Sequence, residues 1–231
     1  RPGFAGRDLT GPCEQVNQVI ARQVATHLAR GKRVGLLGGD HSVSYGALAA
    51  QLARDPAIGV LQIDAHCDLR RAFDGIRYSH ASIMYNALEQ LELQNLVQVG
   101  VRGLCDFEAD YVAASSRVST FFDADLHASR ARGESWLSLC NQIVAPLPAR
   151  VYLSFDIDGL APVWCPDTGT PVPGGLDYND ALYLLQAVLD SGREIIGCDL
   201  VEVGSAPFDA GIAAHLLYQL SGFTLGRGDV S

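Results

Sequence analysis

The sequence predicts an α/β protein with a parallel sheet that is covered by helices on both faces. Short, almost wholly apolar segments alternate with longer segments that repeat apolar residues at helical spacing. Strands that are apolar on both sides belong to buried parallel sheets, where crossover helices cover each face. Acidic and histidine side chains follow several of these segments, at the strand ends where open parallel sheets bind ligands. With 231 residues, we expect a single domain over 1–231.

The predicted elements begin with a helix and then alternate between strand and helix. The opening helix covers 13–30, and Gly31 suits its C-terminal end. The predicted strands cover 33–37, 58–63, 96–101, 118–122, 150–155 and 195–201. The other predicted helices cover 42–54, with Ser42 as N-cap, and 79–92, 106–115, 130–145, 177–191 and 209–221. A segment rich in Pro, Gly and Thr, 160–176, is expected to be a loop.

Six potential metal ligands lie in three short segments that follow predicted strands. They are His41, then Asp64, His66 and Asp68, then Asp156 and Asp158. In extended chain, residues two apart project to the same side, so each set should converge. Carboxylates that lie so close must be protonated or neutralised by cations. Two divalent metal ions are the simplest solution, and such a pair indicates hydrolysis by a metal-activated water.

Composition and charge exclude several classes of function. The formal net charge of -9 and the pI of about 5.0 argue against nucleic-acid or anionic-membrane binding. We find no apolar run long enough to span a bilayer and no signal-peptide pattern. The six scattered cysteines form no Cys-x-x-Cys pair, so we expect reduced thiols and a cytoplasmic location. Because the first residue is Arg1 rather than Met, we expect an N-terminal part to be absent.

Five motifs, in this order, resemble the ureohydrolase family of arginase, agmatinase and formimidoylglutamase. They are Gly-Gly-Asp-His-Ser at 38–42, Asp-Ala-His-Cys-Asp at 64–68, Ser-Phe-Asp-Ile-Asp-Gly-Leu at 154–160, Thr-Gly-Thr-Pro-Val-Pro-Gly-Gly at 168–175 and Asp-Leu-Val-Glu-Val at 199–203. The resemblance implies a three-layer α/β/α fold with a mostly parallel eight-stranded sheet, similar to arginases and deacetylases. It also implies two Mn²⁺ ions per chain, although Ni²⁺ or Co²⁺ could occupy the same ligands. Homo-oligomers, either trimers or hexamers, are expected.

The same resemblance implies roles for individual residues. The first metal would be held by His41, Asp64, Asp68 and Asp156, and the second by Asp64, His66, Asp156 and Asp158. A hydroxide bridging the metals would attack the carbon of a guanidino or amidino substrate. Glu202 would pair with the substrate cation, and His80 would carry a proton to the leaving amine. The alternatives are a surface salt bridge for Glu202 and a structural histidine at a helix N-terminus for His80.

Three arginines between the second motif and His80 bear on the substrate. Arg70, Arg71 and Arg77 could bind a carboxylate through their bidentate forks, or could form a solvated face. A carboxylate clamp favours L-arginine, guanidino acids or formimidoylglutamate over agmatine. We therefore expect an arginase-like enzyme that converts L-arginine to ornithine and urea. The alternatives are a formimidoylglutamase that releases formamide, an agmatinase and a guanidino-acid hydrolase.

Two departures from the family pattern leave other classes of protein open. Ala161 stands where many relatives have Asp, and Asp167 stands where they have Gly. Loss of a carboxylate that supports the ligands could weaken metal binding. A catalytically inactive relative that acts as a structural or regulatory subunit is therefore one rival. A deacetylase with one zinc ion is another, although it would not need a second ligand set.

Overall fold

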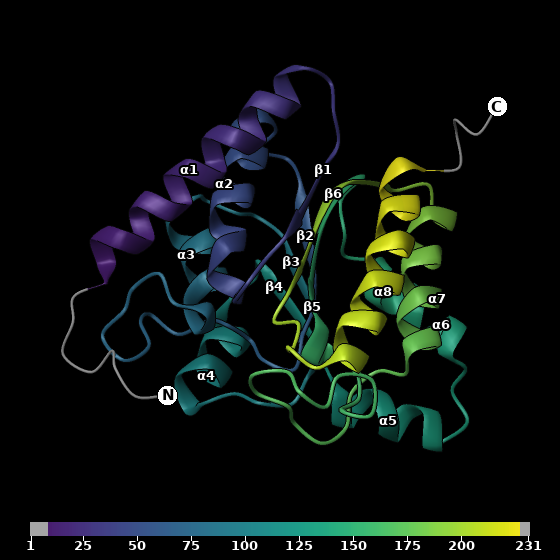
Figure 1. Ribbon diagram of the computed structural model, residues 1–231. Helices are drawn as coiled ribbons and strands as arrows, with labels where there is room; N and C mark the ends of the chain where they lie inside the picture. The colour runs from purple at the N-terminus through teal and green to yellow at the C-terminus, as the bar shows by residue number, and fades with distance from the viewer. Residues whose placement is uncertain (1–8, 227–231) are drawn as a thin grey trace.

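The computed structural model describes residues 9–226, in which six parallel strands form one sheet between two layers of helices (Figure 1). Across the sheet the strands follow the order β1-β6-β5-β2-β3-β4. Their bounds are β1 Val34–Leu37, β2 Gly59–Ile63, β3 Leu96–Val101, β4 Val118–Phe122, β5 Arg150–Asp156 and β6 Glu194–Val201. The predicted α/β class is confirmed. The eight strands expected from the family are not present in the described residues, whose apolar segments supply only these six.

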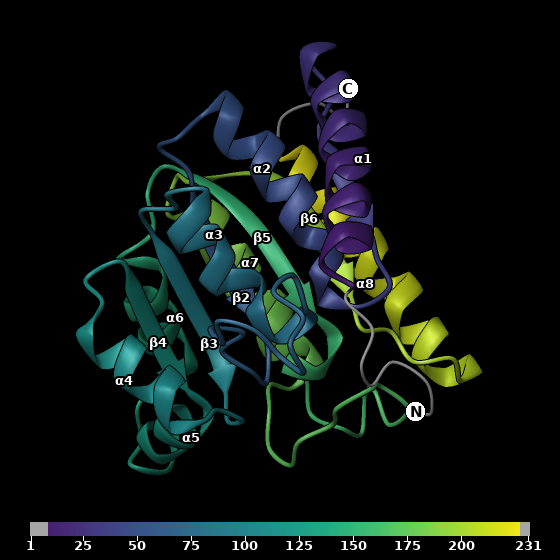
Figure 2. The ribbon, with the colours of Figure 1, turned by 90° about the vertical axis from the view of Figure 1, so that its left-hand side faces the viewer.

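In the part of the chain that the structure describes, four helices cover each face of the sheet. One layer contains α1 Thr10–Ala29, α2 Ser44–Arg54, α3 Ile83–Gln90 and α4 Asp106–Ala114, and Figure 2 shows α1, α2 and α3 in front of the strands. The other layer contains α5 Asp123–Ala131, α6 Trp136–Val144, α7 Tyr178–Asp190 and α8 Pro207–Leu225. Each layer buries its own apolar cluster against the sheet. Among the helices described, none is both long and apolar enough to cross a membrane.

Two helix predictions need correction. Ser42 is not an N-cap: the Asp40 carboxylate accepts the Ser42 N–H at 3.1 Å and caps a short 3₁₀ turn, His41–Val43, so that α2 begins only at Ser44. The single helix predicted over 130–145 is two helices, α5 and α6. Gly133 adopts a left-handed φ of 95° between them, a conformation that interrupts a helix, and residues 132–135 carry no apolar side chain.

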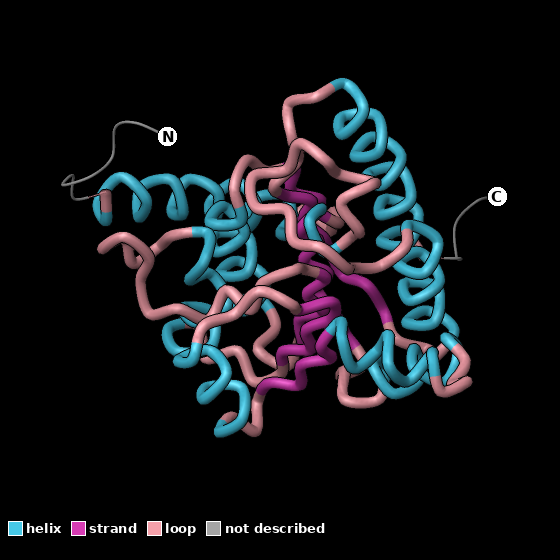
Figure 3. Tube along the Cα trace, turned by 90° about the horizontal axis from the view of Figure 1, so that it is seen from below, coloured by secondary structure: helices cyan, strands magenta, loops and turns pink. Residues whose placement is uncertain are grey.

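The parallel arrangement brings all strand C-termini to one edge of the sheet, where loops form a continuous layer (Figure 3). The four strands β1, β6, β5 and β2 are successive neighbours there. The predicted extended segment 64–68 lies beyond the end of β2 rather than within a strand, and Asp68 has a φ of 54°. The prediction that residues two apart project to the same side therefore holds only for the start of this segment. The backbone of the loop sets the direction of the Asp68 side chain.

Candidate metal centre

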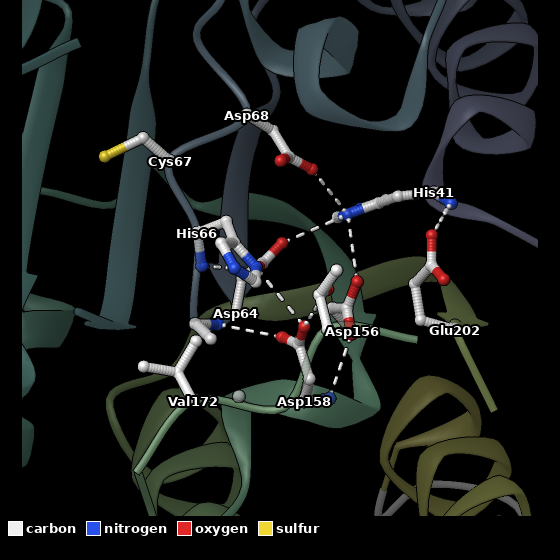
Figure 4. Close-up of polar contacts among 12 residues, drawn as sticks. His41, Asp64, His66, Cys67, Asp68, Asp156, Asp158, Val172 and Glu202 are labelled. Carbon is white, nitrogen blue, oxygen red and sulfur yellow. Dashed lines mark hydrogen bonds and ion pairs between the residues drawn. The ribbon is translucent and has the colours of Figure 1, made fainter. Parts of the chain in front are cut away.

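The six ligand candidates converge at the C-terminal edge of the sheet (Figure 4). His41 lies in the turn after β1, and Asp64 directly follows β2. Asp156 ends β5, and Asp158 lies in the 3₁₀ turn Ile157–Gly159 that follows it. Because these strands are neighbours in the sheet, segments far apart in sequence place their side chains around one point. The sulfur of Cys67 points away from this point.

Two groups of side chains have the spacing of metal ligands. The first comprises His41, Asp64 and Asp156, and the second comprises Asp64, His66 and Asp158. The carboxylate oxygens around His41 Nδ1 lie at 2.9 Å (Asp68), 3.1 Å (Asp64) and 3.5 Å (Asp156). His66 Nδ1 lies 3.2 Å from Asp158 Oδ2 and 3.6 Å from Asp64 Oδ1. Asp64 is common to both groups, which makes it the candidate for a ligand shared by two cations.

Burial makes this concentration of carboxylates electrostatically costly. Desolvation raises the pKa of Asp68 to about 7, and the charge of Asp64 adds to the effect. Desolvation also raises the pKa of Asp156 well above its usual range, together with the charges of Asp64 and Asp158. For His66, desolvation opposes protonation, but hydrogen bonds to Asp158 and Asp64 outweigh it and raise its pKa to about 10. The cluster thus favours bound positive charge, either protons or metal ions.

The hydrogen bonds of His41 test whether a metal fits. Its Nε2 lies 2.8 Å from Ser154 Oγ, which in turn lies 3.0 Å and 3.2 Å from the carboxylate oxygens of buried Asp199. A carboxylate can only accept hydrogen bonds. The Ser154 hydroxyl therefore donates to Asp199 and accepts a hydrogen bond from His41 Nε2–H. The lone pair of Nδ1, a buried atom with no hydrogen-bond partner, then faces three carboxylates. A divalent cation fits this arrangement of donor atoms.

A second buried chain of polar side chains supports Asp64. Gln62 donates to Asp64 Oδ2 at 2.7 Å and accepts from Gln98 at 2.6 Å, and Thr120 donates to Gln98 at 2.8 Å. The chain crosses three adjacent strands, β2, β3 and β4. Sequence reasoning missed these residues and also Ser154. The only available signal was polar residues inside apolar strand segments.

Glu202 lies at the edge of the same cluster, directly after β6. Its Oε1 accepts the His41 backbone N–H at 2.9 Å, and its own N–H donates to Gly39 at 2.9 Å. Its φ of 58° is left-handed, an uncommon and strained conformation for a non-glycine residue. Desolvation raises the pKa of its carboxyl group. Such strain at a carboxylate beside the ligand groups is typical of a functional position.

A cavity of about 130 Å³ opens over the cluster, and the residues along its wall include His80, Glu202, Arg70 and Glu108. The ring of His80 packs against Phe73 with 5.4 Å between ring centres. Of the three arginines expected to bind substrate, only Arg70 lines this cavity.

The other two arginines are not among the residues that line the cavity, and each lies over an aromatic ring. The Arg71 guanidinium lies 5.0 Å from the centre of the Phe107 ring, and that of Arg77 lies 5.6 Å from the Tyr78 ring. The structure therefore does not bring the three arginines together as a clamp.

Arg102 is a further residue with no expected role. Its guanidinium donates to the carbonyl oxygens of Gly100, Asp158, Gly159, Leu160 and Val172. It therefore fixes the backbone that carries Asp158 and the loop that follows it. Ala161, the first departure from the family pattern, forms backbone hydrogen bonds to Leu176 and Trp164 in this loop.

Known proteins share both this sequence and this fold. The model of the Arginase family matches residues 6–222. The N(1)-aminopropylagmatine ureohydrolase of Thermus thermophilus is 37% identical over 93% of this chain and 70% of its own length. The guanidinobutyrase of Pseudomonas aeruginosa is 31% identical over 88% of this chain and 64% of its own length.

Solved structures agree with these sequence relatives. An arginase from Bacillus cereus superposes with a TM-score of 0.80 at 25% identity and covers 96% of this chain and 80% of its own. An arginase from Medicago truncatula superposes with a TM-score of 0.78 at 28% identity and covers 91% and 66%. The chain therefore belongs to the arginase family, and it is a ureohydrolase, an enzyme that hydrolyses C–N bonds in linear amidines of the guanidino class.

Proposed function

We propose that this ureohydrolase releases urea from agmatine or from an agmatine that carries a further aminoalkyl group. The observation that carries the proposal is the charge of the cavity wall. Arg70 is the only Lys or Arg in the described lining, and its Nε already lies 3.5 Å from the Glu108 carboxylate. The wall therefore offers no surplus positive charge to a carboxylate tail. Relatives whose names specify aminopropylagmatine or agmatine support the same substrate class.

In this proposal the six expected ligands hold two divalent cations, with Mn²⁺ as the expected metal. His41, Asp64, Asp68 and Asp156 hold one ion, and Asp64, His66, Asp156 and Asp158 hold the other. Carboxylates with a minority of imidazoles suit Mn²⁺, and Ni²⁺ or Co²⁺ would accept the same donor atoms. When bound, the cations supply Lewis acidity and lower the pKa of a water. Both halves of the sheet contribute ligands, so we infer that one domain carries the whole site.

The remaining chemistry belongs to Glu202 and His80. Glu202 has one carboxylate oxygen occupied by the His41 backbone, which leaves the other for the guanidinium N–H groups. This charge-assisted contact orients the planar substrate carbon toward the ligand cluster. A nitrogen of the His80 ring delivers a proton to the leaving amine, a role that imidazoles commonly take in catalysis.

A guanidino acid is the second candidate substrate, because the Arg70 side chain is 38% exposed at the cavity. Its guanidinium also lies 5.1 Å from the Phe73 ring centre. A long guanidino acid could use the remaining N–H groups of this side chain. L-Arginine, the substrate that the sequence favoured, carries both a carboxylate and an ammonium group. It therefore tests the amine-tail proposal and the guanidino-acid proposal together. Formimidoylglutamate stays a further alternative, and homo-oligomer formation and cytoplasmic location stay predictions.

The experiment measures urea release by the Mn²⁺-loaded protein from agmatine, N1-aminopropylagmatine, 4-guanidinobutyrate and L-arginine, and formamide release from formimidoylglutamate. We expect kcat/KM to be highest for one of the first two. Preference for guanidinobutyrate or arginine would overturn the amine-tail proposal and assign Arg70 to the carboxylate. No turnover of any compound by protein with two bound metals would support an inactive relative, and a single bound Zn²⁺ would support a deacetylase.

A further inference from the structure

Asp167, the second departure from the family pattern, ties the loop 160–176 to the start of α8. Its Oδ2 accepts the backbone N–H of Ala206 at 2.9 Å and the hydroxyl of Ser205 at 3.1 Å. Ala206 is the N-cap residue of α8, where an unpaired N–H and the helix dipole favour a carboxylate. A glycine at position 167 would provide neither contact, so this link is specific to the aspartate of this chain.

The helix binds the loop in return. Asp209, which is fully buried in the first turn of α8, accepts the Asp167 N–H through Oδ2 at 3.0 Å. Gly204 permits this approach, because a Cβ on that residue would lie 2.5 Å from the carbonyl group of Asp167 and 2.7 Å from Asp209 Oδ2. Loop and helix are therefore fixed to each other at two points, on both the side chain and the backbone of Asp167.

The residue after Asp167 contacts the proposed substrate-binding carboxylate. Thr168 is buried, and its hydroxyl donates to the carbonyl oxygen of Glu202 at 2.7 Å. This bond fixes the backbone of Glu202 in its left-handed conformation. Two residues further on, the Thr170 hydroxyl donates to Asp158 Oδ2 at 3.2 Å. One short segment thus reaches both Glu202 and the ligand cluster.

We infer that Asp167 is a positioning residue, which acts through Thr168 to hold the Glu202 carboxylate where it receives the substrate guanidinium. The inference rests on the proposed function of Glu202. A purely structural helix cap would stabilise α8 and leave substrate binding unchanged. A positioning role instead predicts a loss of substrate affinity with little change in turnover, because a displaced Glu202 weakens ground state and transition state alike.

The test compares three variants of the Mn²⁺-loaded protein with agmatine as substrate. Asp167→Ala should raise KM about tenfold and change kcat less than about threefold, because it removes both contacts to α8. Asp167→Asn should rescue KM, since its amide oxygen can still accept from Ala206 and Ser205. Ser135→Ala removes an equivalent cap from α6, where Ser135 Oγ accepts from Ser138 N at 3.2 Å, and should leave KM unchanged. Equal KM values in Asp167→Ala and wild type would overturn the inference.

A double-mutant cycle tests whether Asp167 acts on Glu202 through Thr168. Thr168→Val removes the hydroxyl that contacts Glu202, so Asp167→Ala should add little to KM in that background. Additive effects in the cycle would show that Asp167 does not act through Thr168.

Amide exchange provides a readout that does not depend on activity. The His41 N–H donates to Glu202 Oε1, so it should exchange faster in Asp167→Ala and not in Ser135→Ala. Unchanged exchange would overturn the inference even if no substrate were turned over. Faster exchange in a protein without ureohydrolase activity would instead support the positioning role and refute the proposed function.

Discussion

Ser154→Ala should weaken Mn²⁺ binding without unfolding the protein. Ser154 is fully buried, and its hydroxyl accepts from His41 Nε2 while it donates to Asp199. In the alanine variant the His41 Nε2–H has no acceptor and lies in a site with almost no solvent access. The imidazole can then move its proton to Nδ1, where carboxylate oxygens at 2.9 Å and 3.1 Å accept it. In that tautomer Nδ1 cannot bind a metal, so the metal must displace the proton.

The expected loss is about ten- to a hundredfold in metal affinity, as is typical when the partner of a ligating histidine is removed. That range equals about 1.4–2.8 kcal/mol, at 1.4 kcal/mol for each factor of ten. It agrees with the cost of about 1–3 kcal/mol for leaving a buried hydrogen-bonding group unpaired.

The assay is calorimetric titration of Mn²⁺ into metal-free protein at a fixed pH, with elemental analysis of the bound metal. Ser221→Ala is the matched control, because its hydroxyl is exposed and bonds only within α8, to Leu217 at 2.7 Å. The control should bind Mn²⁺ like wild type. Wild-type affinity in Ser154→Ala would refute the argument that the hydroxyl fixes the tautomer of His41.

Three further predictions concern the same centre. Asp156→Ala should lose metal and turnover together, because its carboxylate serves both proposed ions; retained turnover with two bound metals would contradict this. His80→Ala should lower kcat about 10²- to 10⁴-fold at unchanged metal content, as is typical for loss of a general acid, and a fall in metal content would assign it a ligand role. Metal-free protein should lose thermal stability as pH rises, which differential scanning calorimetry measures. The folded pKa of Asp68 is about 7 against an ordinary 3.8, and that of His66 is about 10 against 6.5, so the native state holds extra protons from about pH 4 to 10. Metal-loaded protein should not show this loss, because the metal replaces those protons.

The sequence predicted the fold class and all six strands because local information suffices for both. Strands such as β2 and β5 are buried almost throughout, so most of their residues are apolar. Such short apolar segments are visible in the sequence itself. The convergence of ligands also followed from topology, since parallel strands end at a common edge. The boundary between α5 and α6 was missed because the left-handed conformation of Gly133 decides it, although residues 132–135 carry no apolar side chain.

The supporting hydrogen bonds could not be predicted from the sequence. The chain from His41 through Ser154 to Asp199 joins residues 113 and 45 positions apart, and no periodicity encodes such partners. Arg70 and Arg71 are sequence neighbours, yet one lines the cavity and the other packs on Phe107. Side-chain direction in a loop depends on backbone dihedrals that composition does not reveal.

The charges of the buried site account for both the metals and the type of substrate. The proposed ligand set contains four aspartates, and among the described residues no lysine or arginine forms an ion pair with any of them. Arg102, the nearby guanidinium, donates instead to backbone carbonyls. Two divalent cations balance those four carboxylates, with both histidines neutral as ligands must be. Glu202 adds a carboxylate to the cavity wall, and among the described residues no lysine or arginine forms an ion pair with it, so a guanidinium would supply the positive charge that neutralises it. A neutral amide would leave the partly buried Glu202 carboxylate without an opposite charge, which is costly, so the site selects a cationic group at this position.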